Sequence, residues 1–153
     1  MRHFVPPMRW APGPRPSVFL AGSIDMGVAP DWQAELARGL EDLDVDVLNP
    51  RRPDWDATWR ATFDQPEFRE QVEWELAGLE GATLVAMYLA PETKAPISLL
   101  ELGLVARREG LVVCCPEGYW RKGNVDVVCA RYGIPQVPEL AALLGWLRDE
   151  LGS

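Results

Sequence analysis

The chain has 153 residues, of which 48% are hydrophobic and 25% charged, and its formal net charge is -8 at pH 7. This length suits one domain, and the composition is that of an ordinary globular protein. The acidic balance argues against a nucleic-acid polymer or an anionic membrane as partner, since both require clustered Lys and Arg. A small anionic ligand is still compatible, because a few local donors are enough to hold a phosphate.

The sequence has no apolar stretch of signal-peptide length and no run approaching the roughly 20 apolar residues of a membrane span, so we expect a cytoplasmic protein. The cysteines are Cys114, Cys115 and Cys129, without C-x-x-C spacing, and the single histidine is His3 in the N-terminal tail. These features argue against a metal site and against a catalytic histidine. We therefore expect carboxylates, amides, hydroxyls and aromatic rings to carry the chemistry.

Residues 1–16 contain five prolines and little periodicity, which predicts an extended or disordered arm before a single domain over 17–153. The patterns then predict five strands, over 18–21, 45–48, 83–89, 111–115 and, as a short one, 135–137. Helices are predicted between and after them, over 30–43, 66–79, 96–108, 124–132 and from the last strand to about 150. A long polar loop is predicted over 50–64.

Alternating strands and helices, with strands that are mostly continuous apolar runs, indicate a doubly wound parallel sheet covered on both faces. We predict a flavodoxin-like α/β fold with five strands in the order 2-1-3-4-5. The second strand carries the charge of Asp46, which predicts an edge position. Ligands of such folds bind at the carboxyl ends of the strands, near the switch point between strands 1 and 3.

Glu101 is the most unusual residue expected at that edge, because it is the only charge in the apolar segment 97–105. Two interpretations are open. Ser98 and Glu101 fit a capping box with Ser98 at the N-cap. Alternatively, Pro96 occupies the first helical turn, and Glu101 lies about one turn into the helix, facing the crevice. A carboxylate there is able to attack an anomeric carbon or to stabilise an oxocarbenium-like cation.

The other loops at this edge supply further candidates, each with a plainer interpretation as a turn, surface or packing residue. The first loop, 22–27, is not a G-x-G-x-x-G fingerprint, so no dinucleotide cofactor is expected. The candidate acids or ribose ligands are Asp25, Asp54 and Asp56. A candidate clamp for an anion is formed by Arg51 and Arg52. The candidates for stacking on a base are Trp55, Trp59 and Trp120. We predict Glu101 and Asp25 as catalytic and, as substrate-binding residues, Gly22, Ser23, Asn49, Arg51, Asp54, Trp55, Ser98, Tyr119 and Asn124.

Over roughly residues 17–138 the chain resembles the nucleoside 2-deoxyribosyltransferase-like family of the nucleoside 2-deoxyribosyltransferase and nucleotide N-glycosidase superfamily. The stretches that carry the resemblance are VFLAGSIDMG, LNPRRPDWD, FREQVEWEL, APISLLELGL and VVCCPEGYWRKGNVDVVCARYGIP. The resemblance implies a flavodoxin-like fold, homo-oligomers whose subunits complete each other's sites, and Glu101 of the Glu101-Leu102-Gly103 motif as the nucleophile. In transferases of the family this Glu forms a glycosyl-enzyme ester that a second base resolves. In relatives acting on nucleoside 5′-monophosphates, water resolves it.

Two positions depart from the family pattern. The family usually has an aspartate at the start of the third strand that helps to protonate the leaving base, and here the matching pair is Ala82-Thr83. The loop before the nucleophile often begins with a phosphate-contacting serine, and here that residue is Ala95. We therefore expect Asp25, or else Asp54 or Asp56, to act as the acid.

The sequence thus predicts an enzyme without a cofactor that cleaves or transfers the N-glycosidic bond of a nucleoside or nucleoside 5′-monophosphate. One alternative is an NAD-type glycohydrolase, which attacks the same kind of anomeric bond in a tryptophan-rich crevice. The other is a nucleotide-sensing or interaction module without turnover. The departures at Thr83 and Ala95 favour the sensor, and the presence of Glu101 argues against it.

Overall fold

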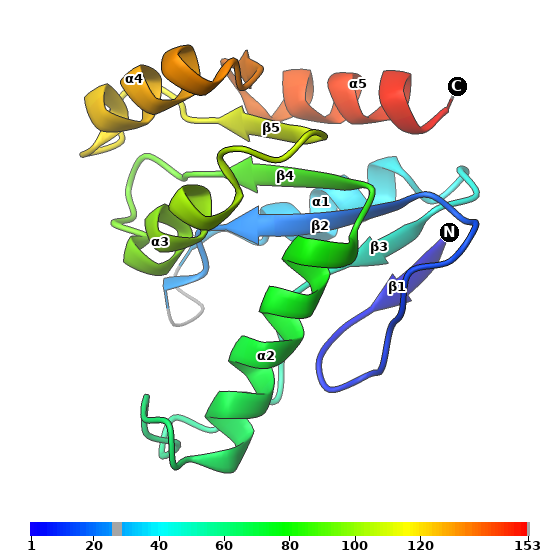
Figure 1. Cartoon of the computed structure of the whole chain (residues 1–153), viewed down its shortest axis with the longest axis vertical. Helices are drawn as coiled ribbons and strands as arrows, with labels where there is room; N and C mark the ends of the chain where they lie inside the picture. The colour runs from blue at the N-terminus through cyan, green and yellow to red at the C-terminus, as the bar shows by residue number, and fades with distance from the viewer. Residues whose placement is uncertain (26–28, 153) are drawn as a thin grey trace.

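In the computed structural model, which describes residues 1–25 and 29–152, helices cover both faces of a six-stranded parallel sheet (Figure 1). The strands are β1 (Arg2–Phe4), β2 (Ser17–Gly22), β3 (Asp46–Leu48), β4 (Leu84–Tyr88), β5 (Leu111–Cys114) and β6 (Gln136–Val137). The helices are α1 (Trp32–Gly39), α2 (Pro66–Gly81), α3 (Pro96–Val105), α4 (Lys122–Tyr132) and α5 (Leu140–Leu151).

The sheet order is β1-β3-β2-β4-β5-β6, with every neighbouring pair parallel. The five strands from β2 onward have the predicted order 2-1-3-4-5, so the flavodoxin-like fold is confirmed. The prediction that the second strand lies at an edge is wrong, because β1 pairs with the outer side of β3. The N-terminal arm is thus ordered at its start, where it adds a sixth strand that the sequence did not predict.

The charge of Asp46 marks the place where the arm binds. Asp46 is buried in β3, and its carboxylate accepts hydrogen bonds from Nε and Nη2 of Arg2, both at 2.7 Å, and from Nε1 of Trp10 at 3.0 Å. A buried carboxylate is tolerated only when donors replace its lost water. The arm supplies those donors, which is why a charge can stand in an inner strand.

The continuous apolar strands are explained by a core on each side of the sheet. In β2, Val18 and Leu20 belong to the layer under α1 and α5, whereas Phe19 and Ala21 belong to the layer under α2, α3 and α4. Alternate side chains of a strand point to opposite faces, so a strand buried on both faces needs an apolar residue at every position.

Helix α2 is buried over only part of its length, and its N-terminal end extends away from the sheet together with the preceding loop (Figure 1). Its buried residues are Gln71, Gly78 and Leu79. A Cβ atom at Gly78 would lie 2.4 Å from the ring of Phe19, so glycine lets the helix press closely onto the sheet. This close approach seats the C-terminal part of α2 on β2 and β3, on the same face of the sheet as α3.

Candidate active site

The loops after β2, β4 and β5 converge on the backbone of Lys94, directly before α3. The Lys94 N–H donates to Oδ2 of Asp25 at 3.3 Å, while Tyr119 Oη and Trp120 Nε1 donate to the Lys94 carbonyl at 2.5 and 2.9 Å. The strands are parallel, so these loops share one edge of the sheet. The contacts fix the segment that leads into the helix of Glu101.

The start of α3 decides between the two interpretations of Glu101. The N-cap is Ala95, in a left-handed conformation with φ of 46°, and Pro96 is the first helical residue. No side chain caps this helix, so the capping box of Ser98 and Glu101 is excluded. Glu101 lies one turn further in and is buried, and burial raises the pKa of its carboxyl to about 7. A carboxylate with no capping role in a largely apolar helix needs another explanation.

Glu75 of α2 is a second buried carboxyl beside Glu101, and sequence reasoning missed it. Burial, followed by repulsion from the charge of Glu101, raises the pKa of Glu75 to about 8, although a hydrogen bond from Gln71 lowers it. As a whole residue Glu75 is half-buried. A nearby like charge acts in this way, so Glu75 and Glu101 lie in the same region of the protein. The spacing of 71, 75, 78 and 79 on one helix face is the signal that points to Glu75.

The two carboxyls differ in protonation near neutral pH. Glu101 ionises first, and its negative charge then makes the loss of the Glu75 proton harder. Near neutral pH the pair therefore retains a proton, and the negative charge of Glu101 favours its retention on Glu75. Paired carboxyls with separated pKa values are the arrangement that general acid and nucleophile chemistry needs.

The turn after β2 is shaped by Gly22 and Ser23. Gly22 has φ of 142°, and a Cβ there would lie 2.0 Å from the carbonyl oxygen of Tyr88, so only glycine fits. The buried Ser23 hydroxyl accepts a hydrogen bond from the Ala90 N–H at 2.9 Å and shares another with Thr93 Oγ1 at 2.6 Å. Ser23 therefore joins the loops after β2 and β4. Met26 and Gly27, in the same predicted loop, lie outside the described residues.

The loop after β3 begins with a turn that ties it to the loop after β2. The buried Asn49 accepts a hydrogen bond from the Arg51 N–H at 2.9 Å. The Arg51 guanidinium in turn donates to the carbonyls of Ala29 at 2.7 Å and Pro30 at 2.9 Å. Arg51 thus holds the two loops together at the switch point.

Further along, Trp55 is part of a small aromatic cluster. Its ring lies edge-on to Trp59, with 4.9 Å between centroids, and the guanidinium of Arg52 lies 5.8 and 5.3 Å from the two rings. The same guanidinium binds the exposed Asp54 carboxylate at 3.0 Å. The cluster gives the long loop a packed core of its own.

The acid candidates in this loop are held ionised. The hydrogen bond from Arg52 lowers the pKa of Asp54, and hydrogen bonds from Thr58 lower the pKa of Asp56. Both are solvent-exposed. A general acid has to carry a proton near neutral pH, so these two carboxylates are poorly suited to that role.

The remaining predicted residues lie at the starts of helices: Ser98 is buried in the first turn of α3, and Asn124 is exposed in the first turn of α4. Within residues 1–25 and 29–152, no group of three or more His, Cys, Asp or Glu side chains is placed to hold a metal ion. Over the same residues, no helix is long and apolar enough to cross a membrane.

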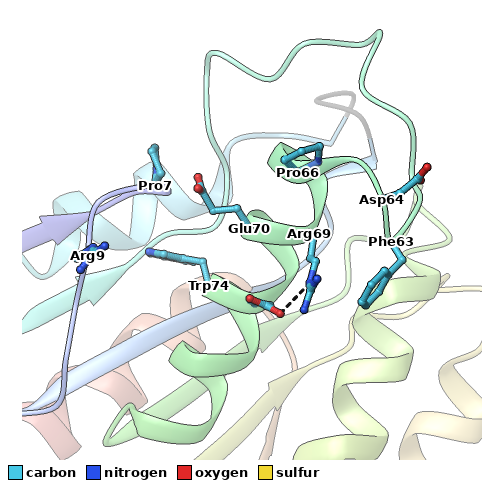
Figure 2. Close-up of a pocket in the computed structure, with 9 residues that line it drawn as sticks. Pro7, Arg9, Phe63, Asp64, Pro66, Arg69, Glu70 and Trp74 are labelled. Atoms are coloured by element: carbon cyan, nitrogen blue, oxygen red, sulfur yellow. Dashed lines mark hydrogen bonds and ion pairs between the residues drawn. The ribbon is translucent and has the colours of Figure 1, made fainter.

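A surface hollow of about 670 Å³ lies elsewhere, between the N-terminal arm and the outer side of α2 (Figure 2). Arg69 and Trp74 line it, but neither Glu75 nor Glu101 does. Arg69 is paired with Glu73 at 3.1 Å, and Trp74 Nε1 donates to the Met8 carbonyl at 2.8 Å. Arg69 is thus engaged in a contact within α2, and Trp74 in a contact with the N-terminal arm. The hollow is therefore not the candidate site.

Comparison with known proteins gives the family. The sequence profile described as "Nucleoside 2-deoxyribosyltransferase like" matches residues 15–119, a span that contains both Glu75 and Glu101. The chain belongs to this family. Its fold is similar to the crystal structure of a conserved protein from Enterococcus faecalis V583, with a TM-score of 0.63 and 14% identity, over 90% of this chain and 99% of that one. No curated protein matched the chain.

Membership of the nucleoside 2-deoxyribosyltransferase-like family gives new weight to position 83. Thr83 stands directly before β4, at the amino edge of the sheet, where its Oγ1 accepts from the Ser17 N–H and its own N–H donates to Ser17 Oγ, both at 3.0 Å. Glu101 follows the opposite, carboxyl edge. In this chain a side chain at position 83 therefore lies at the edge of the sheet opposite to the one that α3 and Glu101 follow.

Proposed function

We propose that the chain cleaves or transfers the N-glycosidic bond of a nucleoside or nucleoside 5′-monophosphate, with Glu101 as nucleophile and Glu75 as general acid. The observation that carries the proposal is the pair of buried carboxyls with raised pKa values contributed by α2 and α3. Family membership supports the substrate class. Asp25, beside the Lys94 backbone, is assigned to positioning of this segment rather than to proton transfer.

The chemistry follows from the protonation of the pair. The Glu101 carboxylate attacks the anomeric carbon while the bond from that carbon to the base nitrogen breaks. Glu75 gives its proton to the departing nitrogen, so the base leaves neutral and Glu75 becomes a carboxylate. Attack on the resulting glycosyl ester by water completes hydrolysis, and attack by a second base completes transfer. Either resolving nucleophile returns a proton to Glu75.

The exposed face of α3 supports a second part of the proposal, that the site is completed in a homo-oligomer. Ile97, Leu100 and Leu104 are 62%, 60% and 60% exposed, and their spacing puts them on one side of the helix. An uncharged helix face of this kind is unusual in a chain with a net charge of -8. We propose that a second copy covers it, beside the turn that carries Glu101.

The test is base release from a panel of deoxynucleosides, nucleoside monophosphates and NAD, followed by mass spectrometry. We expect free base from a nucleoside or monophosphate, and loss of that activity in Glu101→Ala. Glu73→Gln is the matched control, since it alters a carboxylate on the outer face of α2. Adding a second base distinguishes transfer from hydrolysis. Release from NAD alone would favour the glycohydrolase, and base release by Glu101→Ala at the wild-type rate would refute the mechanism.

A further inference from the structure

Trp120, in the loop after β5, holds two cationic side chains against one aromatic ring. The Lys94 ammonium lies 5.5 Å from the centre of this ring, and the Arg121 guanidinium lies 4.5 Å from it. The face of an indole ring is negative and attracts cations, which explains why both side chains gather there. All three residues are exposed, so the two cations are accessible to a ligand.

These three residues come from two loops that hydrogen bonds hold together. Trp120 Nε1 donates to the Lys94 carbonyl at 2.9 Å, and Tyr119 Oη donates to the same oxygen at 2.5 Å. Arg121 is the N-cap residue of α4, so its backbone leads directly into a helix. The two cations are therefore carried by backbone that tertiary contacts keep in place.

The two cations have no carboxylate between them. Neither Lys94 nor Arg121 forms an ion pair with another described residue, and Asp25 binds the backbone N–H of Lys94, at 3.3 Å. Two like charges at one ring repel each other, and the ring offsets only part of that repulsion. An anion that contacts both cations removes the rest. The arrangement therefore favours an anionic ligand over a purely structural role.

The cations stand at the N-terminal end of α3, the helix that carries Glu101. Ala95 is the N-cap and no side chain caps the helix, so the backbone N–H groups of Ile97 and Ser98 have no helical carbonyl to bind. Such N–H groups point out of the helix start and favour an anion there. Glu101 lies about 9 Å further along the helix axis, from the rise per residue of an α-helix.

We propose that Lys94 and Arg121 form a phosphate subsite, which makes a nucleoside 5′-monophosphate a better substrate than the free nucleoside. The guanidinium of Arg121 donates parallel hydrogen bonds to two phosphate oxygens, and the ammonium of Lys94 supplies a second positive charge. A free nucleoside has no charged group to place between them.

This inference rests on the proposed function, because it sets the phosphate at the start of α3 and the anomeric carbon at Glu101. In a nucleotide these two groups lie on opposite sides of the ring oxygen of one sugar, so a single ribose connects them. Helical side chains lean towards the N-terminus, and the Glu101 carboxyl therefore reaches back towards the subsite. The sugar phosphate thus spans the distance between the paired cations and the nucleophile.

The first test is a binding measurement that needs no turnover. Isothermal titration calorimetry compares ribose 5-phosphate and deoxyribose 5-phosphate with the two free sugars, in wild type and in variants. The better-bound sugar phosphate should lose about tenfold or more in affinity in Lys94→Met and in Arg121→Met, and Lys94→Arg should retain most of the affinity. Arg107→Met is the matched control, because this exposed guanidinium lies 5.4 Å from the ring of Tyr132, at the opposite edge of the sheet.

Two results of the binding measurement would overturn the proposal. One is a wild-type protein that binds the sugar phosphates no better than the free sugars. The other is an affinity that Lys94→Met and Arg121→Met leave at the wild-type value, or that Arg107→Met lowers by as much.

The second test uses the specificity of the reaction. The ratio of kcat/KM for a nucleoside 5′-monophosphate to kcat/KM for its nucleoside should fall about tenfold in Lys94→Met and in Arg121→Met, and should keep its wild-type value in Arg107→Met. Added salt should lower the wild-type ratio, because it screens the attraction between phosphate and cations. A structural role of the two cations predicts equal losses for both substrates, and an unchanged ratio would contradict the subsite.

The subsite and the proposed function fail in different ways. Absence of base release from every substrate refutes the proposed function, while calorimetry still decides whether Lys94 and Arg121 bind a phosphate. Equal kcat/KM values of the wild-type protein for nucleoside and monophosphate refute the subsite, and the chemistry at Glu101 then stands without it.

Discussion

Glu101→Gln should stabilise the protein at alkaline pH while removing its activity. The folded protein disfavours the ionised form of Glu101, since burial raises the pKa from 4.5 to about 7. At about 1.36 kcal/mol for each pKa unit, ionising Glu101 in the folded state costs roughly 3 kcal/mol relative to the unfolded chain. Glutamine has nearly the same shape and carries no charge, so it avoids this cost. It also removes the repulsion that raises the pKa of Glu75.

The sign of the effect follows from proton binding. A carboxyl whose pKa is raised on folding binds more protons in the folded state, so stability is greatest below pH 4.5 and falls as pH rises to about 7. The assay is urea unfolding of wild type and Glu101→Gln at pH 4.5 and 8.5. We expect a gain of about 3 kcal/mol at pH 8.5, little difference at pH 4.5, and an unchanged m-value. A variant that is equally or less stable than wild type at pH 8.5 would refute the argument.

Three further outcomes are expected. Glu75→Gln should lower kcat by about 10² to 10⁴-fold, and the fall in wild-type activity above pH 8, where Glu75 loses its proton, should be absent from the pH profile of the variant. Asp46→Asn should lower the free energy of unfolding by about 1 to 3 kcal/mol at pH 7, because the donors of Arg2 and Trp10 lose a charged acceptor. The difference in the free energy of unfolding between wild type and Asp46→Asn should become smaller as pH falls below 3.8, since the arm lowers the pKa of Asp46. Urea unfolding at several pH values measures this difference. Leu100→Glu should shift the protein towards monomer in sedimentation velocity, and an unchanged sedimentation coefficient would exclude the exposed face of α3 as the subunit interface.

The sequence was enough to predict the central fold because its local and global signals agree. Three of the five predicted strands are apolar runs followed by glycine or proline turns, and the parallel order of the strands follows from the alternation with helices. β1 was missed because three residues among prolines carry no periodic signal. Its pairing depends on a tertiary contact, the bond from Arg2 to Asp46, which no local pattern contains.

The candidate site was predicted in part for a similar reason. Glu101 stands out as a single charge among apolar residues, so the sequence alone is enough to make it a candidate. Glu75 is one of several glutamates in α2, and the neighbouring Glu73 is an ordinary exposed partner of Arg69. What separates Glu75 from Glu73 is its surroundings, since burial and the charge of Glu101 act on Glu75, and this becomes visible only when the tertiary packing is known.

The surroundings of the carboxyls also explain why the general acid is expected in the core and not in the exposed loop after β3. Asp54 lies on the guanidinium of Arg52 and Asp56 accepts from Thr58, and each contact stabilises the ionised form. A residue that donates a proton near pH 7 needs the opposite surroundings: little water, no cation and a negative neighbour. Among the described carboxyls, those with raised pKa values are Glu75 and Glu101. The departure at Thr83 therefore gives little support to a sensor without turnover, because a second carboxyl with the required properties lies beside the proposed nucleophile.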